Sequence, residues 1–190
     1  MATMDKASPR DRLLDAAVEL TYREGVNIGV DALCRAAGVS KRSMYQLFDS
    51  KEEMLAAGLK SRIEGYESRF RADPEQASTP RERILYVFRQ LTESADEPGY
   101  CGCPYLAALV ELKDPEHPAH VVSREAKDRL KSTFRELAEL GGAHDPDLLA
   151  RQLTLVFDGA SARSGAGVET LADGLALTMA TTLLDAAGVA

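Results

Sequence analysis

The stretch over residues 36–55, AAGVSKRSMYQLFDSKEEML, limits what this chain can fold into more than any other. Gly38 follows an apolar run, where a glycine is the usual left-handed cap that ends a helix. Ser40 then offers its hydroxyl oxygen to the free backbone amides of a second helix. The apolar residues of this second helix, predicted over 41–48, share one side by their three- and four-residue spacing: Met44, Leu47 and Phe48. The stretch therefore predicts a helix, a glycine turn and another helix.

The other side of the helix predicted over 41–48 is polar. It carries two cations and three neutral hydrogen-bonding side chains: Lys41, Arg42, Ser43, Tyr45 and Gln46. Such side chains can contact both phosphates and the edges of bases. We interpret this face as a DNA-recognition surface. The alternative is a helix face that is merely solvated.

The residues on both sides of this stretch support a helix-turn-helix motif. Apolar residues with helical spacing precede Gly38: Val30, Leu33, Cys34 and Ala37. Ser50 and Glu53 form an S-x-x-E capping box, which starts a further helix near Lys51. The chain before the motif predicts one more helix, which ends at Gly25.

In this combination the chain resembles the tetracycline-repressor (TetR) family of bacterial regulators. The matching residues are Gly25, Ala37-Gly38-Val39-Ser40-Lys41, Tyr45, Phe48 and Ser50-Lys51-Glu52. The resemblance implies a DNA-binding head over residues 1–50 and a ligand-sensing and dimerisation domain over 51–190, which begins with a connecting helix over 51–70. It also implies two partners, a double-stranded DNA operator and a small-molecule effector.

The resemblance also implies roles for residues of the head. Tyr45 and Lys51 are expected to contact phosphate, and Lys41 and Arg42 to lie near phosphates or bases. Gly29 departs from the family, which usually has Thr or Ser there to cap a helix and to bind phosphate; glycine can cap only through its backbone freedom. The predicted DNA-binding set is Gly29, Ser40, Lys41, Arg42, Ser43, Tyr45, Gln46 and Lys51.

The rest of the chain also has helical patterns, and no stretch alternates like a strand. Capping residues and prolines place helix starts at Thr79-Pro80, Pro104, Pro118 and Asp145-Pro146. The small, glycine-rich residues 161–167 are expected to form a loop before a last helix over 168–187. The sequence therefore predicts an all-α protein of about nine helices.

The last two predicted helices carry long apolar stripes. The stripe residues are Leu149, Leu153, Val156, Phe157, Ala160, Leu171, Leu175, Thr178, Met179 and Leu183. One interpretation is that these helices only complete the core of a monomer. The family resemblance instead implies the four-helix interface of a homodimer, whose two-fold symmetry matches two recognition helices to a palindromic operator.

Aromatic residues are spread over the helices that follow the head, and at helical spacing such residues usually belong to a core. The resemblance implies an effector pocket among these helices, which some of the aromatic residues would line. The candidates are Tyr66, Phe70, Phe88, Tyr105 and Phe134. No aromatic-rich box or charged cluster in the sequence indicates the class of effector.

The chain is acidic, with a formal net charge of −7, which is unusual for a nucleic-acid binder. Residues 1–62 contain ten Lys and Arg against nine Asp and Glu, whereas the remainder contains thirteen against twenty-one. DNA affinity must therefore come from a small local patch and depend steeply on salt. The chain begins without the apolar core of a signal peptide, and no apolar run approaches the ~20 residues of a membrane span, so we expect a cytoplasmic protein.

Cys101 and Cys103 lie two residues apart, and thiolates near His117 and His120 could form a zinc or redox site. Their spacing is not the usual C-x-x-C, so we expect a plain turn at the start of a helix and no metal. No P-loop, G-x-S-x-G or H-E-x-x-H motif is present, so neither an enzyme nor a cofactor is expected.

We therefore predict a homodimeric helical regulator, a repressor more than an activator, that a small molecule releases from its operator. The alternatives are a helical adaptor that binds other proteins and a redox- or metal-responsive regulator that uses Cys101 and Cys103.

Overall fold

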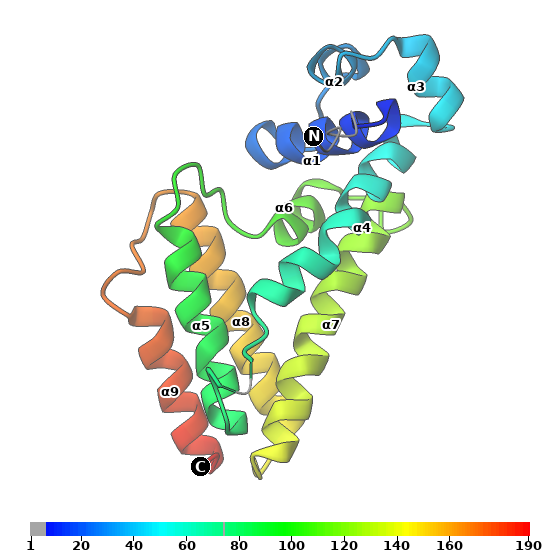
Figure 1. Cartoon of the computed structure of the whole chain (residues 1–190). Coiled ribbons are helices and arrows are strands. Elements are labelled where there is room, and N and C mark those ends of the chain that lie inside the picture. The colour runs from blue at the N-terminus through cyan, green and yellow to red at the C-terminus, as the bar shows by residue number, and fades with distance from the viewer. Residues whose placement is uncertain (1–6, 74) are drawn as a thin grey trace, which may run out of the picture. The chain divides into compact units, whose positions relative to one another are not determined.

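The computed structural model describes residues 7–73 and 75–190, and its regular structure is entirely helical (Figure 1). Nine helices lie in this part of the chain, as the all-α prediction expected. They are α1 (Pro9–Glu24), α2 (Val30–Ala37), α3 (Lys41–Leu47), α4 (Lys51–Arg69), α5 (Pro80–Ala95), α6 (Pro104–Glu111), α7 (Pro118–Leu140), α8 (Pro146–Gly165) and α9 (Leu175–Ala187). None of the described helices is long and apolar enough to cross a membrane.

The chain forms two compact units. Unit 1 contains the described residues up to Arg62 together with Ala107–Arg124, and unit 2 contains Ile63–Leu106 and Glu125–Ala190. Residues 7–50 of the head predicted over 1–50 lie within unit 1; residues 1–6 are outside the described part of the chain. Unit 1 also contains the first part of the connecting helix, α4. Three helices, α4, α6 and α7, have residues in both units, so each unit is covalently continuous with the other through helical backbone.

The turn between α2 and α3 has the geometry that its sequence predicts. Gly38 is left-handed, with φ of 62°, and ends α2. The next amide, that of Val39, donates to the carbonyl of Cys34 at 2.9 Å and closes the turn. Ser40 caps α3 by accepting a hydrogen bond from the Ser43 amide at 3.1 Å. The helix-turn-helix is therefore fixed by local backbone chemistry.

The apolar side predicted for α3 is only partly buried. Met44 and Phe48 are buried, at 0% and 7% exposed, but Leu47 is 40% exposed. The helix ends at Leu47 and Phe48 adopts an extended conformation, which turns the Phe48 ring inward beneath the guanidinium of Arg10. Leu47 is thereby left at the edge of the buried stripe.

Unit 2 is built around aromatic rings. The Phe88 and Phe134 rings stack at a centroid distance of 5.9 Å, and the Phe157 ring meets that of Phe70 edge to face at 5.3 Å. Aliphatic side chains from α5, α8 and α9 complete this core. α5 begins with the predicted capping box, in which hydrogen bonds from the Thr79 amide and from Ser78 lower the pKa of Glu82 to about 2.

The boundary between α8 and α9 differs from the prediction. α8 continues to Gly165, and α9 begins only at Leu175, after a left-handed Gly174 with φ of 76°. The small residues over 161–165 are therefore helical. Two of them pack closely against other parts of the chain: Ser161 is fully buried, and a Cβ on Gly165 would lie 2.4 Å from the backbone of Cys101 and Gly102.

Replacing Gly165 by alanine is expected to destabilise the fold, because overpacking of this kind costs about 1–3 kcal/mol. The matched control is Gly65→Ala in α4, where a Cβ meets nothing within 4 Å and the helix propensity of alanine adds up to about 1 kcal/mol. Denaturant unfolding should move the two midpoints in opposite directions. A Gly165→Ala protein as stable as the parent would contradict the packing.

Candidate DNA-binding surface and internal cavity

The polar face of α3 is open to solvent in unit 1. Lys41, Arg42 and Gln46 are exposed, and the Tyr45 side chain is 55% exposed. Ser43 is half-buried, and its hydroxyl lies 2.9 Å from that of Ser40 within the helix cap. The face can therefore present two cations, a phenol and an amide to a ligand, while the two serines fix the start of the helix.

The two cations of this face have different surroundings. The Lys41 ammonium lies 2.7 Å from the Asp31 carboxylate of α2, and this hydrogen bond raises the pKa of Lys41. The pair is exposed, so it adds little to stability, but it holds Lys41 beside the first turn of α2. Arg42 has no ion-pair partner among the described residues, and its guanidinium is free to meet an anion.

Lys51 makes hydrogen bonds to the backbone that the sequence did not indicate. Its ammonium donates to the carbonyl oxygens of Val26 at 3.3 Å and Ile28 at 3.1 Å. Two of the three N–H donors of the ammonium are thus engaged within the turn between α1 and α2, and one is left for a phosphate. Lys51 therefore positions this turn in the structure, and its phosphate contact stays a prediction.

Gly29 caps α2 without any side-chain hydrogen bond. Its backbone is extended, with φ of −74°, and a Cβ would meet nothing within 4 Å. The position therefore does not require glycine, and a serine or threonine would fit there.

Glu111, at the end of α6, completes the support of the same turn. Its Oε2 accepts a hydrogen bond from the Val26 amide at 2.8 Å. Gly25 lies against it: φ is 89°, and a Cβ would approach Oε2 to 2.6 Å. Sequence reasoning missed Glu111. The sequence feature that could have indicated Glu111 was a carboxylate in the last turn of a helix, where the helix dipole disfavours negative charge.

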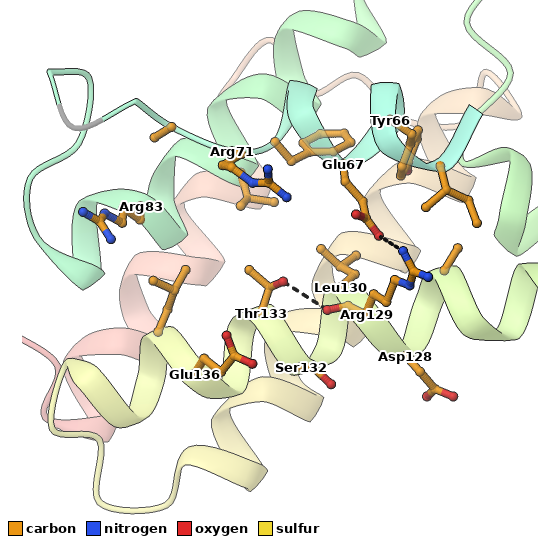
Figure 2. A pocket seen from close by; sticks show the side chains of 16 residues that line it. Tyr66, Glu67, Arg71, Arg83, Asp128, Arg129, Leu130, Ser132, Thr133 and Glu136 are labelled. Atoms are coloured by element: carbon orange, nitrogen blue, oxygen red, sulfur yellow. Dashed lines mark hydrogen bonds and ion pairs between the residues drawn. The ribbon is translucent and has the colours of Figure 1, made fainter. Parts of the chain in front are cut away.

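Unit 2 contains a cavity of about 660 Å³, which Figure 2 shows with its lining side chains. Of the five predicted aromatic residues, Tyr66 and Phe70 line it. Phe88, Tyr105 and Phe134 do not line it, and each is at most 1% exposed. Ring packing accounts for the difference, because rings stacked against one another are not available to a cavity.

Charged side chains that the sequence did not single out also line this cavity. Glu67 of α4 and Arg129 of α7 form an ion pair with 3.7 Å between Oε1 and Nη1 (Figure 2). Arg71, Arg83, Asp128 and Glu136 complete the charged lining. Tyr66 also lines the cavity; its hydroxyl pairs with Cys103, and burial raises the pKa of Tyr66 well above its usual value. The cavity is thus mixed in polarity.

The predicted dimer residues divide into two groups. Leu149, Leu153 and Phe157 are at most 1% exposed in the core of this chain, and Leu171, at 2% exposed, also lines the groove between α8 and α9. The others are partly or fully exposed: Val156, Ala160, Leu175, Thr178, Met179 and Leu183. Leu155, which the prediction missed, is 73% exposed. It lines a groove of about 340 Å³ together with four of these six residues: Val156, Ala160, Leu175 and Met179.

The cysteines show no grouping with other metal ligands. Cys101 is exposed and Cys103 is buried, and neither takes part in a disulfide bond. Within the described ranges no three His, Cys, Asp or Glu side chains are arranged to hold a metal ion.

The helix-turn-helix region has known relatives. Residues 13–57 match the family model of bacterial regulatory proteins of the tetR family. A TetR transcriptional regulator from Streptomyces avermitilis, known from its crystal structure, is 57% identical, with a TM-score of 0.93 over 97% of this chain and 100% of that one. This chain belongs to the TetR family.

More distant members of the TetR family match along most of the chain. A regulator from Streptomyces coelicolor is 25% identical, with a TM-score of 0.84 over 95% of this chain and 96% of that one. The HTH-type transcriptional regulator YjdC of Escherichia coli is 24% identical over 158 residues, which are 81% of this chain and 82% of that protein. As a member of the TetR family, the chain is a DNA-binding transcriptional regulator and not an enzyme.

In this TetR-family chain, Glu111→Ala is expected to weaken DNA binding, because it leaves the Val26 amide without an acceptor and loosens the turn before α2. A part-buried donor that loses its partner costs about 1–3 kcal/mol. Glu111→Gln keeps a carbonyl oxygen at this place and should restore most of the loss. Unfolding midpoints and DNA affinity of both variants measure the effect; equal behaviour of the two would contradict the role of the hydrogen bond.

Proposed function

We propose that this protein is a repressor that binds a palindromic operator as a homodimer and is released from DNA by a small molecule. The observation that carries the proposal is the small size of the DNA-binding element. One chain offers a recognition helix of seven residues, Lys41–Leu47. A helix of this size gives few base contacts, whereas two copies related by a two-fold axis read two half-sites.

The side chains on α3 differ in the operator contacts that they can make: some suit phosphates and one suits a base edge. Arg42 and Tyr45 can bind phosphates, which sets affinity and register without reading sequence. The Gln46 amide can donate and accept at a base edge, as adenine requires in the major groove. Lys41 is held beside Asp31 and can reach a phosphate only near the start of α2.

The proposed dimer face lies on α8 and α9 of unit 2. Leu155, Leu175 and Met179 are exposed there and line the groove of about 340 Å³. Contiguous exposed apolar side chains are typical of interaction sites. We assign this face to a second copy of the chain, because a palindromic operator requires a self-complementary, two-fold interface.

The cavity of unit 2 is the proposed effector site, and its volume lies in the range of small-molecule pockets. A ligand there would contact α4, whose first part belongs to unit 1. Through Lys51, α4 holds the turn that precedes α2. An effector that favours the DNA-incompetent arrangement by about 1–3 kcal/mol would lower operator affinity roughly 5- to 150-fold.

Tyr45→Phe and Gln46→Ala are expected to affect operator binding differently. Loss of the Tyr45 hydroxyl should weaken binding to all sequences similarly, since a phosphate contact carries no sequence information. Loss of the Gln46 amide should reduce discrimination at one base pair by about 1–3 kcal/mol. Gel shifts on the DNA upstream of the gene, at two salt concentrations, measure both effects. Gln90→Ala in α5 is the matched control, and unchanged binding by both α3 variants would refute the assignment.

Met179→Glu is expected to separate the proposed dimer, because it places a charge in an apolar interface. Leu140→Glu is the control: Leu140 is 72% exposed at the end of α7 and lies outside the proposed face. Sedimentation should give a monomer for the first variant and a dimer for the second, with operator affinity falling only in the first. A parent protein that sediments as a monomer at micromolar concentration would rule out the homodimer.

A further inference from the structure

One oxygen atom in the cavity of unit 2 lacks a hydrogen bond. Oε1 of Glu67 is buried and has no hydrogen-bond partner in the described part of the chain. The nearest charged group is Nη1 of Arg129 at 3.7 Å, which is beyond hydrogen-bonding distance. Buried carboxylate oxygens are normally hydrogen-bonded, and an orphaned one is costly. A ligand that donates an N–H to this atom would remove the cost.

The other charged groups of the cavity either have hydrogen-bond partners or are exposed to solvent. Asp128 accepts a hydrogen bond from Lys131 at 2.8 Å, and Arg83 donates to the carbonyl of Ala77 at 3.3 Å. Arg71 and Glu136 are exposed, so water already solvates their charges. A ligand would therefore gain least from these groups and most from Glu67.

The surroundings of Glu67 also suit a cation. Tyr66, its neighbour on α4, and Phe70, which directly follows that helix, place their rings edge to face at 5.1 Å and line the cavity. The faces of such rings attract cations. The competing cation, Arg129, has a side chain that is 59% exposed, so it can move into solvent when a ligand approaches Glu67.

We propose that the cavity binds an amphipathic cation, in which a protonated amine or amidine donates to Glu67 and an apolar body packs against Tyr66, Phe70 and Leu130. Val87 and Leu137 extend the apolar wall. This inference rests on the proposed effector function and adds the chemical class of the effector.

A matched set of three probes tests the class: phenylbutylamine, phenylbutanol and phenylbutyrate share one apolar body and differ in the charge of the head group. Calorimetric titration of the full-length protein should show the amine binding about tenfold or more tightly than the alcohol or the acid. Glu67→Gln should remove this preference, whereas Glu64→Gln, on an exposed position of the same helix outside the cavity, should keep it. Arg129→Met should strengthen amine binding, because it removes the competing cation.

Three results would overturn the inference: tightest binding of the acid, an amine preference that survives Glu67→Gln, or binding of none of the probes. The same titrations in the presence of labelled operator DNA test the proposed function separately. An amine that binds through Glu67 but does not release DNA would refute release while supporting the class of ligand. An acid that binds and releases DNA would refute the class while supporting release.

Discussion

The backbone of Val26 is held by side chains of opposite charge, and the DNA-binding surface depends on this. Its amide donates to Glu111 of α6, and its carbonyl accepts from Lys51 of α4. Both charges act on one residue of the turn that leads into α2, and Val26 itself is only 4% exposed. The turn sets where α2 begins, and α2 with Gly38 sets where α3 begins. A shift of α4 or α6 would therefore change the presentation of the recognition helix.

The same two helices meet again in unit 2. Tyr66 of α4 and Tyr105 of α6 pack edge to face at 5.1 Å, and Tyr66 also lines the cavity. In unit 1, α4 and α6 are linked through Val26, to which both helices bond, and in unit 2 they are in direct contact through ring packing.

In this protein, most aromatic rings serve the core of unit 2, and much of the cavity lining is charged. Large rings stabilise unit 2 by burial and by packing on one another, so Phe88, Phe134 and Phe157 are fully buried in the core. The cavity instead has charged side chains in its lining, among them the ion pair of Glu67 and Arg129. Charge in the lining is therefore a better guide to the ligand than the number of aromatic residues.

Local rules in the sequence were sufficient for most of the helices, for the Gly38 turn and for the Ser40 and Thr79 caps, because these depend on residues at most five positions apart. They also gave the polar face of α3, the part of the candidate site that lies on one short helix. Only the tertiary structure decided which stripe residues of α8 face the core, why Gly165 is helical, and that Glu111 reaches Val26 across 85 residues of chain. Such contacts join distant segments, and nothing in the local sequence of either partner specifies the other.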